Sequence, residues 1–124
     1  MRTVLIVEDN EKNMKLARDV LQAKGYQTLE AITGEEGVKL AREKLPDLVL
    51  MDIQLPGING IEAFKQIRAD AKTARIPVIA LTASVTPTDR TAISAAGFDA
   101  FVSKPINLKE FVDTVKRFAE SGRK

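Results

Sequence analysis

Charged and hydroxyl side chains directly follow four short apolar runs of the sequence. They are Glu8 and Asp9 after residues 4–7, Asp52 after residues 48–51, Thr82 after residues 78–81, and Ser103 with Lys104 after residues 100–102. Open α/β sheets bind their ligands at the carboxyl ends of the strands. If the apolar runs are parallel strands, three carboxylates, hydroxyl groups and an ammonium therefore converge on one rim.

The three carboxylates of this rim predict a divalent cation. Like charges held close together raise one another's pKa and destabilise the fold, and Lys104 alone cannot neutralise three of them. Oxygen ligands without His or Cys select hard metals, and a few carboxylates completed by water and phosphate oxygens suit Mg²⁺ better than Ca²⁺. The sequence also lacks the D-x-D-x-D-G loop of calcium sites. Mg²⁺ is therefore the expected cofactor.

Asp52 has the position and the chemistry of a nucleophile. A carboxylate can attack phosphorus and form an aspartyl phosphate. That reaction needs a metal to neutralise the phosphoryl oxygens, a second cation and a hydroxyl donor, and Lys104 and Thr82 are placed to be the last two. Neither G-x-G-x-x-G nor G-x-x-x-x-G-K-[ST] occurs in the chain. Nucleotide binding is therefore disfavoured, and the phosphoryl donor must be another phosphorylated molecule.

The composition excludes several other kinds of site. The 124 residues include no histidine and no cysteine, which removes Ser-His triads, imidazole and thiolate metal ligands, disulfides and a phosphohistidine on this chain. The 19 basic and 17 acidic residues are spread along the chain, which argues against nucleic-acid binding. No apolar run approaches the roughly 18 residues of a membrane span, so we expect no membrane insertion and a cytoplasmic protein.

The elements that must position the rim residues follow from the hydrophobic pattern. Strands are expected at residues 4–7, 26–30, 48–51, 78–81 and 100–102, and helices at 11–24, 34–44, 59–68, 87–95 and 108–120. Four solid apolar runs are typical of strands buried on both faces of a parallel sheet, whereas residues 26–30 alternate and indicate an edge strand. The pattern predicts an α/β fold of five βα units with strand order 2-1-3-4-5.

Local signals support these boundaries. Asn10, Thr33 and Asn107 are suited to cap helices, and Gly25 and Gly97 are suited to end them. Residues 1–120 are expected to form one domain, followed by a polar tail at 121–124. Segment 86–96 has few large apolar residues, so its helix is expected to be the most loosely held.

Each rim residue taken alone has an ordinary structural explanation. Glu8 and Asp9 can cap the first helix, Thr82 can bond to the backbone, Lys104 can be solvated, and Asp52 can open a turn. The spacing of all these residues on successive predicted strands is what favours a functional site.

Four segments together resemble the response-regulator receiver family of two-component signalling. They are residues 4–10 (VLIVEDN), 50–56 (LMDIQLP), 76–83 (IPVIALTA) and 103–105 (SKP). They occur in the family's order and extend over the whole chain. The resemblance implies a flavodoxin-like (βα)5 fold and a phosphoacceptor function.

The resemblance also implies roles at the rim. Asp52 would accept a phosphoryl group from the phosphohistidine of a histidine kinase or a histidine phosphotransfer protein. Glu8 and Asp9 would hold Mg²⁺ with Asp52 and the backbone carbonyl of Gln54. Lys104 would pair with the acceptor.

A further set of residues would connect phosphorylation to output. Thr82 and Phe101 would form the switch, although Phe101 lacks the hydroxyl of the tyrosine that is common at this position. A cis bond at Pro105 would aim the neighbouring lysine, and Gln54 and Ser84 would tune dephosphorylation.

The expected protein is a signalling switch rather than an enzyme, and its output is protein binding through residues 86–120. It is expected to be a monomer or a weak dimer. The chain is similar to stand-alone receivers, but a receiver excised from a hybrid histidine kinase would share the same segments. A small phosphatase would need an acid where Gln54 stands. A pseudo-receiver acting by contacts alone would carry its clustered charge at a cost.

Overall fold

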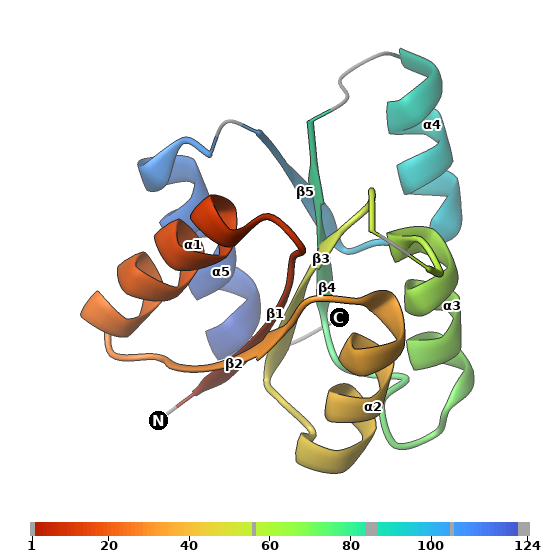
Figure 1. The fold of residues 1–124 in the computed structure, drawn as a ribbon, viewed down its shortest axis with the longest axis horizontal. Helices are drawn as coiled ribbons and strands as arrows, with labels where there is room; N and C mark the ends of the chain where they lie inside the picture. The colour runs from red at the N-terminus through yellow and green to blue at the C-terminus, as the bar shows by residue number, and fades with distance from the viewer. Residues whose placement is uncertain (1, 56, 84–86, 105, 122–124) are drawn as a thin grey trace.

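The computed structural model describes residues 2–55, 57–83, 87–104 and 106–121. Over these residues strand and helix alternate five times, as Figure 1 shows. The elements are β1 (Thr3–Val7), α1 (Glu11–Ala23), β2 (Gln27–Ala31), α2 (Gly34–Lys44), β3 (Leu48–Asp52), α3 (Gly60–Ala69), β4 (Val78–Thr82), α4 (Pro87–Ala96), β5 (Ala100–Ser103) and α5 (Leu108–Ser121). Within the described ranges, none of the helices is long and apolar enough to span a membrane.

The five strands form one parallel sheet in the order β2-β1-β3-β4-β5. The predicted architecture and strand order are therefore confirmed. Every residue of β3 and of β4 is buried, as expected for solid apolar runs covered on both faces. Strand β2 exposes Gln27 and Glu30 and lies at an edge of the sheet, as its polar and apolar alternation predicted.

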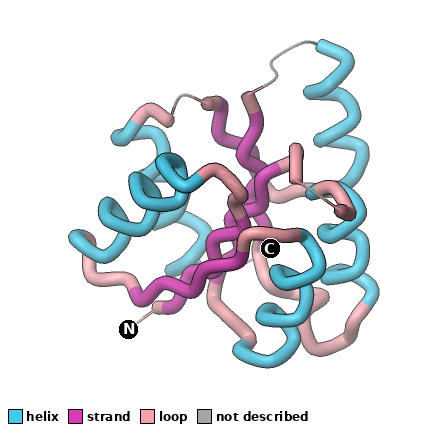
Figure 2. The backbone as a smooth tube through the Cα atoms, viewed as in Figure 1, coloured by secondary structure: helices cyan, strands magenta, loops and turns pink. Residues whose placement is uncertain are grey.

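Two helical layers cover the sheet. Successive residues of a strand point to opposite faces, so Val4 and Ile6 pack in a core with α1 and α5, whereas Leu5 and Val7 pack in a core with α2 and α3. Figures 1 and 2 show α1 and α5 on one side of the strands and α2, α3 and α4 on the other. The helices thus leave the carboxyl edge of the sheet to the loops that follow the strands.

Side chains cap the starts of four helices. Asn10, Thr33 and Asn107 accept hydrogen bonds from the backbone N–H groups three residues later, which confirms the predicted caps. Asn59 does the same for α3 by accepting from Glu62 N at 2.9 Å. These caps satisfy backbone donors that would otherwise lack partners at the helix starts.

The helix ends agree in part with the sequence. Gly25 and Gly97 adopt positive φ angles of 92° and 100° just after α1 and α4, as predicted. Leu45 ends α2 in the left-handed region with φ of 47°, which no sequence signal indicated because leucine rarely adopts it. Helix α5 includes Ser121, and the rest of the expected tail lies outside the described residues. The expected looseness of segment 86–96 falls partly on undescribed residues and stays a prediction.

A polar clamp holds the amino ends of β4 and β5 to α3. Asp99 Oδ2 lies 2.7 Å from Arg68 Nη2 and accepts a second bond from Val78 N at 2.8 Å. Arg68 also donates to the Ile76 carbonyl at 2.6 Å. The guanidinium lies 4.8 Å from the Phe64 ring centroid. The clamp therefore fixes the edge of the sheet opposite to the predicted rim.

Candidate functional site

Two acidic residues of the rim, Glu8 and Asp52, lie together because their strands are neighbours and their positions share one face. Val7 pairs with Met51, so Glu8 and Asp52 are the next residues of adjacent strands. Asp52 follows Leu48 and Leu50, whose side chains pack on the α1 and α5 side. Glu8 and Asp52 therefore point toward the same side of the sheet.

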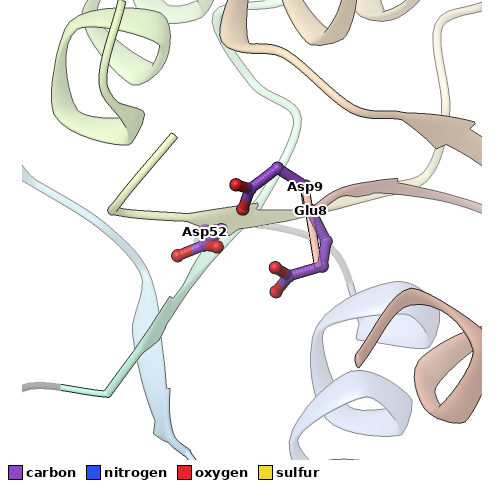
Figure 3. Close-up of side chains that lie close together, drawn as sticks. All are labelled: Glu8, Asp9 and Asp52. Carbon is purple, nitrogen blue, oxygen red and sulfur yellow. The ribbon is translucent and has the colours of Figure 1, made fainter. Parts of the chain in front are cut away.

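Three carboxylates form the centre of the site. Glu8, Asp9 and Asp52 each place one carboxylate oxygen within 4.8 Å of the others. Figure 3 shows the three side chains turned toward a common space at the ends of β1 and β3. Glu8 and Asp52 are almost fully buried, while Asp9 is exposed. The cluster is thus open to solvent on the Asp9 side.

Glu8 is held by the protein at both oxygens. Oε1 accepts from Asn10 N at 3.0 Å. Oε2 lies 2.7 Å from Lys104 Nζ in an ion pair that lacks the alignment of a hydrogen bond. Burial raises the pKa of Glu8 to about 7, even though Lys104 opposes the shift. Near neutral pH the protonated and ionised forms of this side chain are therefore both populated.

Lys104 bridges two of the acids. Its ammonium lies 2.7 Å from Glu8 Oε2 and 3.1 Å from Asp52 Oδ2. Burial alone lowers the pKa of Lys104, but its interactions with the carboxylates of Glu8 and Asp52 outweigh this effect and leave the pKa above the ordinary value. Lys104 is therefore a fixed positive charge at the acidic cluster.

Asp52 is oriented by its own loop as well as by Lys104. Its Oδ1 accepts from Gln54 N at 3.0 Å, and its Oδ2 faces the ammonium. Only 3% of the residue is exposed. The carboxylate is thus held in one orientation at the end of β3. Gln54 itself is exposed, and the expected ligand role of its carbonyl stays a prediction.

Thr82 and Phe101 lie on the neighbouring strands. Thr82 is buried, and its carbonyl accepts from Lys104 N at 2.7 Å. In the register of β4 and β5, Thr82 pairs with Ser103 and Ala80 pairs with Phe101. Thr82 and the partly buried Phe101 therefore project from the same face of the sheet.

Two of the predicted residues cannot be placed. Ser84 and Pro105 lie outside the described residues. The expected tuning of dephosphorylation by Ser84 and the expected cis bond at Pro105 therefore stay predictions.

The donor set fits a hard divalent cation. Three carboxylates face one ammonium in a mostly buried space, and the excess of acid over base favours a further positive charge. All the side-chain atoms that could bind a metal here are carboxylate oxygens, which Mg²⁺ prefers as ligands. Glu8, Asp9 and Asp52 all turn oxygens to the shared space. Asn10 and Lys104 also contact Glu8, as Gln54 and Lys104 contact Asp52.

Two features of the site gave no signal in the sequence. The ion pair between Glu8 and Lys104 depends on the rotamer of the long Lys104 side chain, which follows the carboxyl end of β5. The approach of Gly60 to the backbone of Asp52 depends on the path of the intervening loop. A glycine just after Asn59 is visible in the sequence, but its contact is not.

Known proteins share both the sequence pattern and the fold. Residues 4–116 match the family model described as the response regulator receiver domain. The polar-differentiation response regulator DivK of Brucella ovis (strain ATCC 25840 / 63/290 / NCTC 10512) is 47% identical over 117 residues, which cover 94% of this chain and 95% of that protein.

Solved structures give the same result. The receiver domain of the sensor histidine kinase PA1611 from Pseudomonas aeruginosa PAO1, solved with a magnesium ion in its active-site cleft, has a TM-score of 0.90 and 32% identity. The alignment covers 96% of this chain and 98% of that one. The chemotaxis protein CheY4 of Vibrio cholerae has a TM-score of 0.88 and 26% identity, covering 94% of this chain and 98% of that one.

Proposed function

The chain belongs to the response regulator receiver family, and on that premise we propose that it accepts a phosphoryl group on Asp52. The donor is the phosphohistidine of a histidine kinase or of a histidine phosphotransfer protein. The observation that carries the proposal is the buried Asp52 carboxylate, bonded to Gln54 N and paired with Lys104 inside a cluster of three acids. The phosphoryl donor can approach this cluster from its solvent-facing side, where Asp9 is exposed.

The transfer exchanges one bond to phosphorus for another. An oxygen of Asp52 attacks the phosphorus of the donor, a P–O bond forms, and the P–N bond to the histidine breaks. The imidazole leaves with the electron pair of that bond and takes up a proton. Lys104 stabilises a phosphoryl oxygen by its charge, and the Thr82 hydroxyl donates to another.

Glu8, Asp9, Asp52 and the Gln54 carbonyl would hold Mg²⁺. When bound, the ion neutralises charge on the phosphoryl oxygens. In this arrangement Glu8 keeps Lys104 in place through their ion pair. The magnesium ion of the PA1611 receiver domain, a family member of the same fold, supports this assignment.

The phosphorylated domain acts as a switch for other proteins, as a cytoplasmic stand-alone response regulator similar to DivK. Thr82 moves toward the phosphoryl group and leaves space on its face of the sheet, and Phe101 turns inward. The surface of residues 86–120 then changes and binds a downstream protein. Water later hydrolyses the aspartyl phosphate, at a rate tuned by Gln54 and Ser84.

Phosphorylation by acetyl phosphate tests the acceptor. The wild-type protein should gain one phosphoryl group only with Mg²⁺, because the clustered acids otherwise repel the donor. Asp52→Asn should remove the label, since the amide cannot form the acyl phosphate. Intact-mass spectrometry measures both results.

The matched control is Asp113→Asn, which makes the same change at an exposed position of α5 and should keep full labelling. A label that survives Asp52→Asn, or that forms equally in EDTA, contradicts the proposal.

A further inference from the structure

The first residue of α3 lies directly against the peptide that follows Asp52. A Cβ atom added at Gly60 would overlap the Asp52 carbonyl oxygen and would lie 2.7 Å from Ile53 Cα and 2.9 Å from the Asp52 carbonyl carbon. These partners are backbone atoms, which cannot turn aside as a flexible side chain can. Gly60 is also buried. Only the absence of a side chain allows α3 to begin here.

Hydrogen bonds hold both ends of the loop between β3 and α3 close to Asp52. At the start, Ile53 N donates to the Leu81 carbonyl at 3.0 Å, and Gln54 N donates to the Asp52 carboxylate at 3.0 Å. At the end, Gly60 N donates to the Ile53 carbonyl at 2.9 Å. The backbone that carries the acceptor is therefore enclosed between β4 and the start of α3.

Neighbouring contacts fix the place of Gly60 itself. Asn59 caps α3 by accepting from Glu62 N, which sets the first turn of the helix. On the other side of the loop, a Cβ atom at Gly34 would lie 2.8 Å from the Ile58 carbonyl oxygen. Residues 57–59 are thus held between the first turns of α2 and α3, and α3 has little freedom to retreat from Asp52.

We propose that Gly60 is a positioning residue for phosphoryl transfer, because its missing side chain lets the start of α3 hold the Asp52–Ile53 peptide in place. A larger residue would push this peptide away and displace both the Asp52 carboxylate from Lys104 and the Gln54 amide from that carboxylate. The inference rests on the proposed function of Asp52 as the acceptor. Gly60 acts through Asp52 and touches no reacting atom.

The test compares Gly60→Ala with a control on the same helix. Ile67 is fully buried in α3, so Ile67→Val weakens the packing of α3 without touching the loop. With acetyl phosphate at saturating Mg²⁺, Gly60→Ala should phosphorylate at least about tenfold more slowly than the wild type, since small displacements of reacting groups cost large factors in rate. Ile67→Val should remain within about twofold of the wild type.

A second measurement needs no phosphoryl transfer. Hydrogen exchange of the Gln54 amide reports its bond to Asp52, and it should be protected in the wild type and in Ile67→Val but fast in Gly60→Ala. Apparent Mg²⁺ affinity, followed by NMR titration, should weaken in the same variant only. A loss of stability alone would instead affect both variants alike.

Asn59→Ala provides a variant that keeps the glycine if Gly60→Ala does not fold. It removes the cap that fixes the first turn of α3 and should give the same pattern more weakly. Equal rates and equal Gln54 protection in the Gly60 or Asn59 variant and in Ile67→Val overturn the inference. An unlabelled wild type instead overturns the function of Asp52, while the exchange data still decide whether Gly60 holds the loop.

Discussion

Glu8 is a buried acid whose charge depends on its neighbours. Burial disfavours its ionised form, and among the described residues Lys104 and the Asn10 amide compensate this effect directly. The pKa of about 7 means that the protein at neutral pH holds a mixture of protonated and ionised Glu8. A bound divalent cation would favour the ionised form. A proton and a metal ion therefore compete for the acidic cluster near neutral pH.

The stability of the metal-free protein should fall as pH rises from about 4.5 to about 7. In this range the folded protein keeps a proton on Glu8 that the unfolded chain, with its ordinary pKa of 4.5, has released. The folded state therefore binds more protons, and the free energy of unfolding falls with pH. The pKa of Lys104 is raised, so its contribution is fully present below its ordinary pKa and adds no slope here.

Urea unfolding in EDTA between pH 4 and pH 8 measures this effect. The fall attributable to Glu8 should be at most about 3.5 kcal/mol, at about 1.4 kcal/mol for each unit of pKa shift. Glu8→Gln should remove that part of the slope, and Mg²⁺ should reduce it in the wild type. An unchanged slope in Glu8→Gln would assign the pH dependence to other groups.

The residue types of the site could be predicted from the sequence, but their contacts could not. Asp52, Thr82 and Lys104 each follow an apolar run, and parallel strands bring such positions to one edge. The pairing of Lys104 with Glu8 depends instead on side-chain rotamers and burial. These are set by packing across the whole fold and have no local signature.

At the scale of elements, the hydrophobic pattern was sufficient for the strands and for most helix ends. Burial on both faces makes β3 and β4 continuously apolar, and alternation marks β2 as an edge. Leu45 was not predictable, because its left-handed backbone ends α2 without the glycine or asparagine that usually signals such an end. The clamp joins two residues, Arg68 and Asp99, that are 31 positions apart in the sequence, and no spacing rule identifies this pair.

Removal of the negative charge of Asp99 from the clamp should destabilise the protein strongly. Asp99→Asn removes the carboxylate charge that pairs with the Arg68 guanidinium, which is only 16% exposed. Breaking a buried ion pair by removing one partner typically costs about 3–5 kcal/mol. We expect a smaller loss than this, about 2–3 kcal/mol, because asparagine can still accept from Val78 N.

Asp70→Asn makes the same change in the more exposed pair of Asp70 with Arg42. It should cost less than about 1 kcal/mol. Urea unfolding of both variants gives the comparison. Similar losses in the two variants would mean that the buried clamp contributes no more than a surface ion pair.

In the whole molecule, the proposed functional site and the main structural ion pair lie at opposite ends of the strands. The acidic cluster and Lys104 lie at the carboxyl ends of the strands, whereas the clamp of Arg68 and Asp99 joins the amino ends of β4 and β5 to α3. When Asp52 is modified, β4 and β5 are therefore held in place at their amino ends. The response should be largest along β4 and β5, where Thr82 ends β4 and Phe101 lies within β5.

Beryllofluoride, a mimic of the phosphoryl group, tests this route. In the wild type it should shift amide NMR signals along β4, β5 and α5, because in the proposed switch Thr82 moves and leaves space for Phe101. Thr82→Ala should bind the mimic but show mainly local shifts around Asp52. Thr28→Ala, at the edge strand β2, should respond like the wild type. Equal long-range shifts in all three proteins would exclude Thr82 as the coupling residue.

At the edge of the sheet opposite to the acidic cluster, the start of β1 and the end of α5 lie close together. Arg2, which precedes β1, and Glu120, in the last turn of α5, line the same pocket with Pro46 and Pro77. A short Gly- and Ser-rich linker could therefore join them, and new termini could be opened in the exposed turn at residues 71–72. Such a circular permutant would keep every strand pairing and leave the acidic cluster untouched. The order in which the five βα units are encoded is thus only one of several that would build this site.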